Sequence, residues 1–228
     1  MTIPRLAAAL VALLALAIPT RADPASAVAA CRAAPGTIRI AGPILCFTGD
    51  IDAGTAARAM ALLPTPGLTT LVIASDGGEV TAAVRLARAI RARGLMLVVD
   101  DRCASSCANF LFPAARTKAV AERALLIFHG GIAPGAFGGL FGGGEERDLL
   151  ALTRAFFREI GVDGAITYDP PYRRDPRSGL RELAEEWTAT PAALARYGMT
   201  GIIQMWWPSN EAVLREAARR GMRLGIVE

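Results

Sequence analysis

Two short runs of exclusively apolar residues flank an amphipathic helical pattern, and this segment limits the possible folds more than any other. The runs occupy residues 71–74 and 95–99, and the helical pattern between them extends over about 79–93. Its apolar residues recur at intervals of three and four, whereas its arginines lie on the other side. Strands without a polar face are typical of parallel sheets covered by helices. The segment therefore predicts a β-α-β unit and an α/β fold.

The remaining mature chain continues this alternation, without an internal repeat or a sign of a second domain. A single domain is expected over 37–228. Its other expected elements are strands 37–41 and 44–48, a helix from Asp50 or Asp52 to about Leu63, strands 119–120 and 125–128, a helix over 145–160, a surface loop over 161–180, and a final helix–strand–helix segment.

The first 22 residues have the pattern of a cleaved secretory signal. Arg5 and the amino terminus supply positive charge, residues 6–18 are small or aliphatic, and Ala22 precedes the expected cleavage point. An apolar helix of this length rises only about 20 Å, which is too short for a bilayer core of about 30 Å. The pattern therefore favours a signal peptide over a membrane anchor and predicts a periplasmic or secreted protein. Residues 23–36 are interpreted as a lead segment before the domain.

The charge of the predicted mature chain argues against a nucleic-acid partner. The chain has 25 basic and 21 acidic residues, and the predicted signal contains two of the arginines and no acidic residue. Phosphate binding needs a concentrated basic face, whereas these arginines are spread along the expected helices.

Cys31, Cys46, Cys103 and Cys107 are the four cysteines of the chain. An even number in an exported protein favours disulfides, and proximity in sequence favours pairing Cys31 with Cys46 and Cys103 with Cys107. The alternative, half of a metal site at Cys103 and Cys107, is less favoured because the chain has a single histidine. We expect neither a metal nor another cofactor.

Three segments carry residues suited to catalysis. The first, 75–78, reads Ser-Asp-Gly-Gly at a strand-to-helix junction, where paired glycines and free N–H groups favour negative charge. The second, 103–110, places Ser105 and Ser106 at the start of an expected buried helix, where serines also serve as helix caps. The third ends an apolar strand at His129, beside glycine-rich sequence. A histidine in this position is suited to act as a general base.

Together these segments resemble the proteolytic subunit of Clp-type proteases and the wider crotonase-like group. Residues 75–82 resemble that family's Ser-Pro-Gly-Gly-Ser-Val-Thr-Ala stretch, and Ala104-Ser105-Ser106 falls where the family has its nucleophile. The step of 24 residues from Ser105 to His129 is within one residue of the family's own. Tyr197-Gly198-Met199 is similar to the family's Tyr-Gly-Leu. The resemblance covers about 37–205 and is closest to an exported branch with a Cys-Ala-Ser-x-Cys motif.

The resemblance implies a Clp-protease/crotonase-like spiral of β-β-α units with a mostly parallel sheet. It implies Ser105 as nucleophile, His129 as general base, and the N–H groups of Gly78 and Ser106 as an oxyanion hole. Ser106 is the alternative nucleophile. Where the family has a third catalytic residue, an Asp, this chain has Glu186 beside Glu185, and the competing interpretation places both on an exposed helix end.

Two further residues depart from the family pattern. Asp76 replaces the family's Pro and brings a negative charge to the expected oxyanion hole, unless it caps the following helix. Lys118, the only lysine, is the candidate for a Ser–Lys dyad, although its position gives this no particular support.

The leading functional hypothesis is a periplasmic serine hydrolase, a peptidase acting on peptide or protein substrates without a nucleotide. The alternative is a catalytically inactive relative that serves as a binding or assembly module; acyl-CoA chemistry is disfavoured in an exported protein. The resemblance also implies a homo-oligomer that associates through helix 145–160. The glycine-rich stretch 130–144 is interpreted as a lid or a substrate-binding strand.

Overall fold

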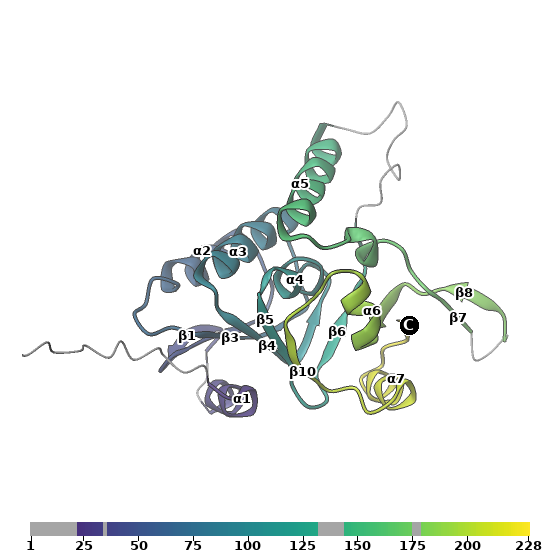
Figure 1. Cartoon of the computed structure of the whole chain (residues 1–228), viewed down its shortest axis with the longest axis horizontal. Helices are drawn as coiled ribbons and strands as arrows, with labels where there is room; N and C mark the ends of the chain where they lie inside the picture. The colour runs from purple at the N-terminus through teal and green to yellow at the C-terminus, as the bar shows by residue number, and fades with distance from the viewer. Residues whose placement is uncertain (1–21, 34–35, 132–143, 175–178) are drawn as a thin grey trace, which may run out of the picture.

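A seven-stranded, mostly parallel sheet forms the centre of the structure (Figure 1). The computed structural model describes residues 22–33, 36–131, 144–174 and 179–228. The predicted signal and most of the glycine-rich stretch 130–144 lie outside these residues. The α/β class with a mostly parallel sheet is confirmed, whereas the specific spiral of β-β-α units stays a prediction.

The strands of the central sheet follow the order β1-β2-β3-β4-β5-β10, and β6 pairs separately with β4. Only β1 and β2 are antiparallel, and they form the hairpin expected around Gly42. The strand bounds are β1 Ile38–Ala41, β2 Ile44–Thr48, β3 Thr70–Ser75, β4 Met96–Ala104, β5 Thr117–Val120, β6 Leu125–Ile127 and β10 Ile202–Met205.

Strand β4 is longer than predicted because it changes partner midway. Its first part pairs with β5 as far as Val99, and its second part pairs with β6 from Arg102 onward. Between them Asp101 adopts a φ of 58°. The buried Asp100 carboxylate receives two hydrogen bonds from the guanidinium of Arg32. The sequence expectation that this strand ends at Val99 was wrong, because these polar residues look like a loop until their distant partner is known.

Helices cover both faces of the sheet (Figure 1). Helix α2 begins after Asp52, whose side chain accepts a hydrogen bond from the Thr55 N–H, and α3 ends at Gly94 in the left-handed conformation. Both agree with the predicted limits. The helices on the same face of the sheet as α2 and α3 have the following bounds: α2 Ala53–Leu62, α3 Val80–Arg93, the π-helix η1 Cys107–Leu111, α4 Phe112–Ala114 and α5 Gly144–Ile160.

The predicted lead segment contains a helix on the opposite face of the sheet. Helix α1 (Pro24–Arg32) has Asp23 as its N-cap and Pro24 in its first turn. Besides the contact of Arg32 with Asp100, a disulfide joins Cys31 to Cys46 in β2, as the spacing favoured. These two links attach α1 to the sheet. Because the helix is short and has few large apolar residues, its sequence pattern did not predict it.

The C-terminal part contains more elements than the sequence predicted. The expected loop 161–180 holds the 3-10 helix η2 (Gly164–Thr167). The expected last helix–strand–helix segment is present as α6, β10 and α7, but a strand, β11, follows it. The observed elements are β7 Tyr172–Arg174, β8 Arg181–Leu183, β9 Glu186–Ala189, α6 Pro191–Arg196, α7 Asn210–Arg219 and β11 Leu224–Val227. These strands are three or four residues long, too short for local periodicity to reveal them, and β9 pairs with the distant β11.

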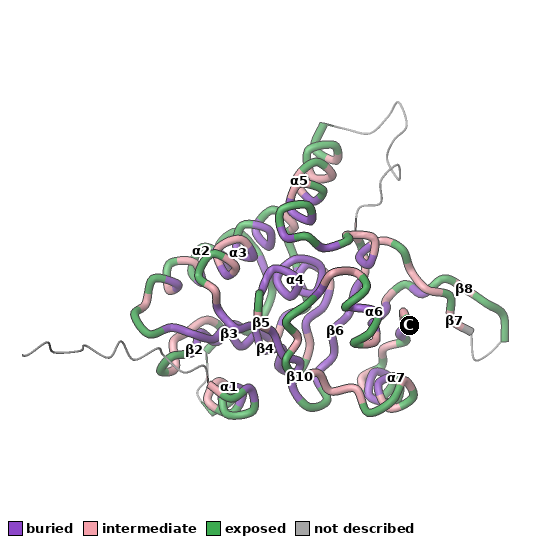
Figure 2. Tube along the Cα trace, in the orientation of Figure 1, coloured by how far each residue is buried: buried purple, intermediate pink, exposed green. Residues whose placement is uncertain are grey.

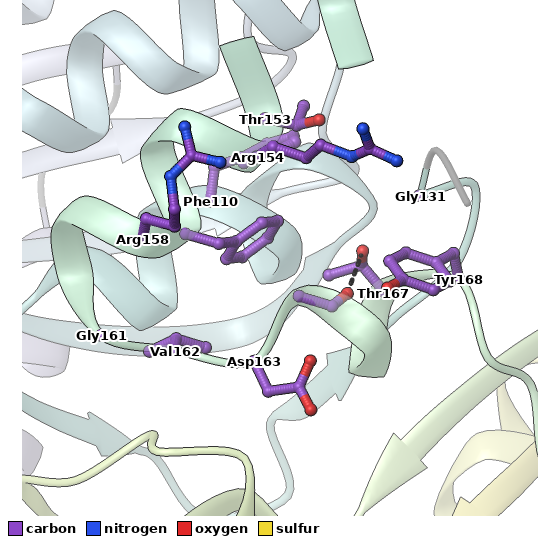
Figure 3. A pocket seen from close by; sticks show the side chains of 12 residues that line it. Phe110, Gly131, Thr153, Arg154, Arg158, Gly161, Val162, Asp163, Thr167 and Tyr168 are labelled. Carbon is purple, nitrogen blue, oxygen red and sulfur yellow. Dashed lines mark hydrogen bonds between the residues drawn. The ribbon is translucent and has the colours of Figure 1, made fainter. Parts of the chain in front are cut away.

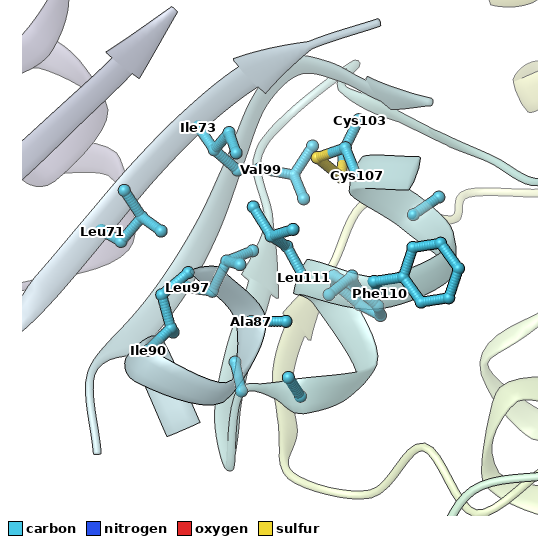
Figure 4. Packing of buried hydrophobic residues seen from close by; sticks show 14 of the residues in the cluster. Leu71, Ile73, Ala87, Ile90, Leu97, Val99, Cys103, Cys107, Phe110 and Leu111 are labelled. Atoms are coloured by element: carbon cyan, nitrogen blue, oxygen red, sulfur yellow. A yellow bond between two sulfur atoms is a disulfide. The ribbon is translucent and has the colours of Figure 1, made fainter. Parts of the chain in front are cut away.

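The core lies between the central strands and the helices above them (Figure 2). Side chains from β3 and β4 pack there against α3 and η1 (Figure 4), among them Leu71, Ile73, Leu97, Ala87 and Leu111. All five are at most 1% exposed. In the described ranges, no helix is both long and apolar enough to cross a membrane.

Helix α5 projects from the body, and only its C-terminal half packs on the core (Figure 1). Phe156 and Ile160 of the predicted apolar stripe are buried, and Phe156 contacts Phe110 edge-on with ring centroids 5.7 Å apart. Leu149 and Leu152, nearer the start of the helix, are partly exposed. The C-terminal part of the apolar stripe is therefore buried against the core of the same chain. Association between chains through this helix stays a prediction.

Lys118 is a buried cation in β5. Its side chain is 2% exposed, its ammonium lies 5.4 Å from the centre of the Phe112 ring, and it donates one long hydrogen bond, 3.4 Å, to the Pro113 carbonyl. Burial, and then the positive charge of Arg91, lower the pKa of Lys118 from 10.5 to about 8. The folded protein therefore holds this proton less tightly than the unfolded chain does.

We predict that Lys118→Met stabilises the protein at pH 7 in a buffer without phosphate or sulfate. At pH 7 the folded wild type holds a buried charge at a cost of roughly 3 kcal/mol, which is the equivalent of its pKa shift. As the pH rises from about 8 to 10.5 the folded lysine loses its proton first, so wild-type stability rises and the difference shrinks. Urea unfolding at pH 7 and pH 10.5 measures both values. A variant less stable than wild type at pH 7 would contradict the prediction.

Candidate functional site

The three segments singled out in the sequence meet at one edge of the sheet. Strands β3, β4 and β6 are parallel, and the register pairs Ser75 with Cys103 and Ala104 with Ile127. Their carboxyl ends are therefore adjacent, and the residues that follow them, including Ser105 and His129, lie side by side. Such an edge is where ligands bind in open α/β sheets.

Ser105 occupies the turn between β4 and the helical segment that begins at Ser106. Its φ is 50°, in the left-handed region that residues other than glycine rarely adopt. Its N–H donates to the Ile127 carbonyl (3.0 Å), and its own carbonyl accepts from the Asn109 N–H (2.7 Å). Backbone strain of this kind costs about 1–3 kcal/mol and is concentrated at functional sites. The Ser105 side chain is partly exposed.

A disulfide between Cys103 and Cys107 encloses this turn. Both cysteines are fully buried, so the bond lies in the core (Figure 4). This pairing is the one favoured by the sequence, and the bonded sulfurs are no longer available as thiolate ligands for a metal. In the described ranges, His, Cys, Asp and Glu side chains form no group of three that could hold a metal ion.

Gly77 and Gly78 bring the β3–α3 turn against the Ser105 turn. A Cβ on Gly77 would lie 2.7 Å from the Ala104 oxygen, the Ser105 Cβ and the Ser106 nitrogen. Only glycine fits here, at a φ of 97°. The N–H groups of Gly78 and Ser106 find no acceptor among the described residues, so both remain available to a ligand.

The Ser106 hydroxyl is already engaged. It donates a 2.7 Å hydrogen bond to the Gly78 carbonyl, and the residue is 3% exposed. The Ser105 hydroxyl has no such bond among the described residues and is more accessible. This difference favours Ser105 over the alternative nucleophile Ser106.

Asp76 forms an ion pair with Arg102 rather than capping α3. Arg102 Nε lies 2.5 Å from Asp76 Oδ1, and Nη2 donates to Oδ2 at 2.8 Å. The N-cap of α3 is Glu79, which makes no capping hydrogen bond with its side chain. The negative charge beside the glycine pair is thus compensated by a cation from β4, a partner that the sequence did not indicate.

The backbone of His129 is fixed by the helix that follows Ser105. Asn109 Nδ2 donates a 2.8 Å hydrogen bond to the His129 carbonyl, and His129 is partly exposed. Among the described residues, its imidazole makes no hydrogen bond with Ser105 or Glu186. Catalytic hydrogen bonds are often long in a protein without substrate, so the absence of this hydrogen bond does not exclude His129 as a general base.

Glu186 begins strand β9, and the interpretation of an exposed helix end was wrong for it. Phe128 and Trp187 form an antiparallel bridge with two backbone hydrogen bonds of 2.7 and 3.0 Å. The bridge is isolated, but continuing its antiparallel register sets His129 opposite Glu186. Residues directly opposite each other place their side chains on the same face, with Cβ atoms about 4.5–5.5 Å apart. Glu185, the neighbouring residue, is exposed.

A cavity of about 290 Å³ lies beside this edge, between α5 and η2 (Figure 3). Phe110 and Phe157 contribute apolar surface, and Gly131 is two residues beyond His129. Arg154 and Arg158 extend along one side, across from Asp163 (Figure 3). A cavity of this kind suits an uncharged or apolar group with a polar end.

Sequence reasoning missed this cavity because it treated 161–180 as a surface loop. Ile166 and Thr167 are buried, and the Trp187 indole donates a 2.8 Å hydrogen bond to the Ile166 carbonyl. The available signal was the pair of aliphatic residues Val162 and Ile166 in an otherwise polar stretch.

Compared with known proteins, the chain matches no protein-family model and no curated protein sequence. The assignment of site residues therefore rests on the motifs, their spacing and the geometry described above.

We predict that Gly77→Ala lowers the free energy of unfolding by at least about 2 kcal/mol more than Gly49→Ala does. Both glycines have a positive φ, 97° and 111°, but a Cβ on Gly49 meets no atom within 4 Å. Gly49→Ala thus measures the backbone strain alone, and the difference measures contact with the Ser105 turn. Urea unfolding of both variants checks this, and equal losses would show that the turns do not press together.

Proposed function

We propose that this protein is a serine hydrolase that cleaves peptide or protein substrates outside the cytoplasm. The observation that carries the proposal is Ser105, which occupies a strand-to-helix turn at a φ of 50°, beside two backbone N–H groups that have no acceptor among the described residues. Serine nucleophiles need this combination of an accessible hydroxyl and N–H donors where negative charge develops.

In the proposed mechanism the Ser105 Oγ attacks the carbonyl carbon of the scissile amide. His129 takes the hydroxyl proton and then gives it to the leaving amine as the C–N bond breaks. The N–H groups of Gly78 and Ser106 stabilise the oxyanion of the tetrahedral intermediate. Water then hydrolyses the acyl-enzyme by the same route, which restores the serine.

Three further features support this assignment of roles. The register opposite His129 makes Glu186 the candidate for orienting the imidazole and stabilising its positive form. The ion pair between Arg102 and Asp76 lowers the electrostatic cost of an oxyanion beside Asp76. The cavity near Gly131 offers room for a substrate side chain.

The two disulfides support an exported location, because such bonds persist in oxidising compartments. The predicted signal peptide points to the same place. Association into a homo-oligomer through the exposed half of α5 remains part of the proposal.

The alternative is an inactive binding or assembly protein built on the same fold. One observation favours it: the imidazole of His129 makes no hydrogen bond with Ser105 or Glu186 among the described residues. A fold never guarantees chemistry, so a measurement has to decide between the two functions.

We predict that a fluorophosphonate probe forms a covalent adduct on Ser105 of the purified, correctly oxidised protein. The adduct should be absent in Ser105→Ala and in His129→Ala, because the serine is unreactive without its base. Intact mass and peptide mapping locate it. An adduct on Ser106 would correct the nucleophile, and no adduct from a folded sample would favour the binding protein.

We also predict that Glu186→Gln slows the reaction with the probe at least about tenfold, because the amide no longer stabilises the imidazolium. Glu185→Gln is the matched control: it removes the same charge from the neighbouring, exposed residue and should leave the rate within about twofold. Equal rates in both variants would remove Glu186 from the site.

A further inference from the structure

Lys118 lies in a second cavity, which the proposed mechanism does not use. The cavity has a volume of about 180 Å³, and its lining includes Arg91, Arg116, Lys118, Val162 and Thr200. Lys118 pairs with Leu97 of β4. Leu97 lies seven residues before Ala104, the last residue of β4 and the neighbour of Ser105. At the rise of a strand this separation is roughly 20 Å, so the cavity is distinct from the edge that carries Ser105.

The charge in this cavity is positive and uncompensated. Arg91, Arg116 and Lys118 contribute three cations, and the lining contains no acidic residue. Among the described residues, none of these three side chains forms an ion pair with a carboxylate. Arg91 instead donates to the Ala114 carbonyl (3.1 Å).

Lys118 is the most deeply buried of the three cations. It is 2% exposed, and its one hydrogen bond, to Pro113, is 3.4 Å long. An ammonium group has three donors, so most of its hydrogen-bonding capacity is unused among the described residues. A buried lysine is almost always paired, and an unpaired one in a polar cavity indicates a partner from outside the chain.

We propose that this cavity is a binding site for a small oxyanion, with Lys118 and Arg91 as its inner cations and Arg116 at its exposed rim. Such an anion restores the charge balance and accepts the unused ammonium hydrogens. The Thr200 hydroxyl, which makes no hydrogen bond among the described residues, supplies a neutral donor. The volume admits phosphate, sulfate or a carboxylate group.

The site is separate from the proposed hydrolase activity, so each can fail without the other. Its cavity also shares Val162 with the larger cavity near Gly131. An anion bound here therefore lies next to the segment that joins α5 to η2.

The test is calorimetric titration of the full chain at pH 7 with inorganic phosphate and, separately, with acetate. We expect binding of at least one of these anions, weakened at least about tenfold in Lys118→Met and in Arg116→Gln, because each variant removes a charged contact. Comparing the two anions distinguishes a phosphate-like ligand from a carboxylate. Arg85→Gln is the control, since Arg85 is exposed on α3 outside the cavity. Its binding should stay within about twofold of wild type.

A second measurement ties binding to Lys118 itself. Lys118 is the only lysine in the chain, so protein labelled with ¹³C-lysine gives a single Cε signal by NMR. The bound anion should shift this signal in wild type and in Arg85→Gln. Three results would overturn the proposal. They are no binding of either anion, binding that persists in Lys118→Met, and a Cε signal that does not shift when an anion binds.

Discussion

The divided pairing of β4 is the constraint on which the rest of the structure depends. Its first part is held by β5 and its second part by β6, with the contact between Arg32 and the buried Asp100 at the change of partner. Because β4 continues beyond β5, it carries Ser105 to an edge formed with β3 and β6. The same division leaves Lys118 near the start of β5, far from that edge. One strand thus separates the candidate catalytic site from the cationic cavity.

The candidate catalytic edge is fixed by several independent contacts rather than by one strong interaction. The Cys103–Cys107 disulfide encloses the turn, Gly77 packs against it from the β3–α3 turn, and hydrogen bonds of the Ser105 backbone connect it to β6 and to the following helix. A left-handed serine persists only where its surroundings determine it in this way. Among the described residues, the N–H groups of Gly78 and Ser106 have no acceptor, because neither of the two closely packed turns offers one.

The two sites differ in whether their charged residues are paired within the protein. At the candidate catalytic edge, the negative Asp76 is balanced by Arg102, so the space before Ser105 carries little net charge. In the second cavity, the cations Arg91 and Lys118 have no carboxylate partner among the described residues. A buried and uncompensated lysine reduces stability, and its lowered pKa follows from that cost. A protein keeps such a group where binding compensates for it, which connects the physical cost of Lys118 with the proposed anion site.

The sequence by itself determined the elements that local chemistry specifies. Apolar runs, capping residues and glycines located β3, α2 and α3, and the spacing of the cysteines indicated both disulfides. Motif spacing also selected Ser105 and His129, which do lie on adjacent strand ends. Only the tertiary structure decided the extension of β4, the attachment of α1, the pairing of Asp76 with Arg102 and the bridge between Phe128 and Trp187 beside His129 and Glu186. Each of these depends on a partner distant in the chain, and a short polar segment has no local pattern that identifies such a partner. Periodicity reports which face of an element is buried, but the partner that it meets is determined by the packing of the whole chain.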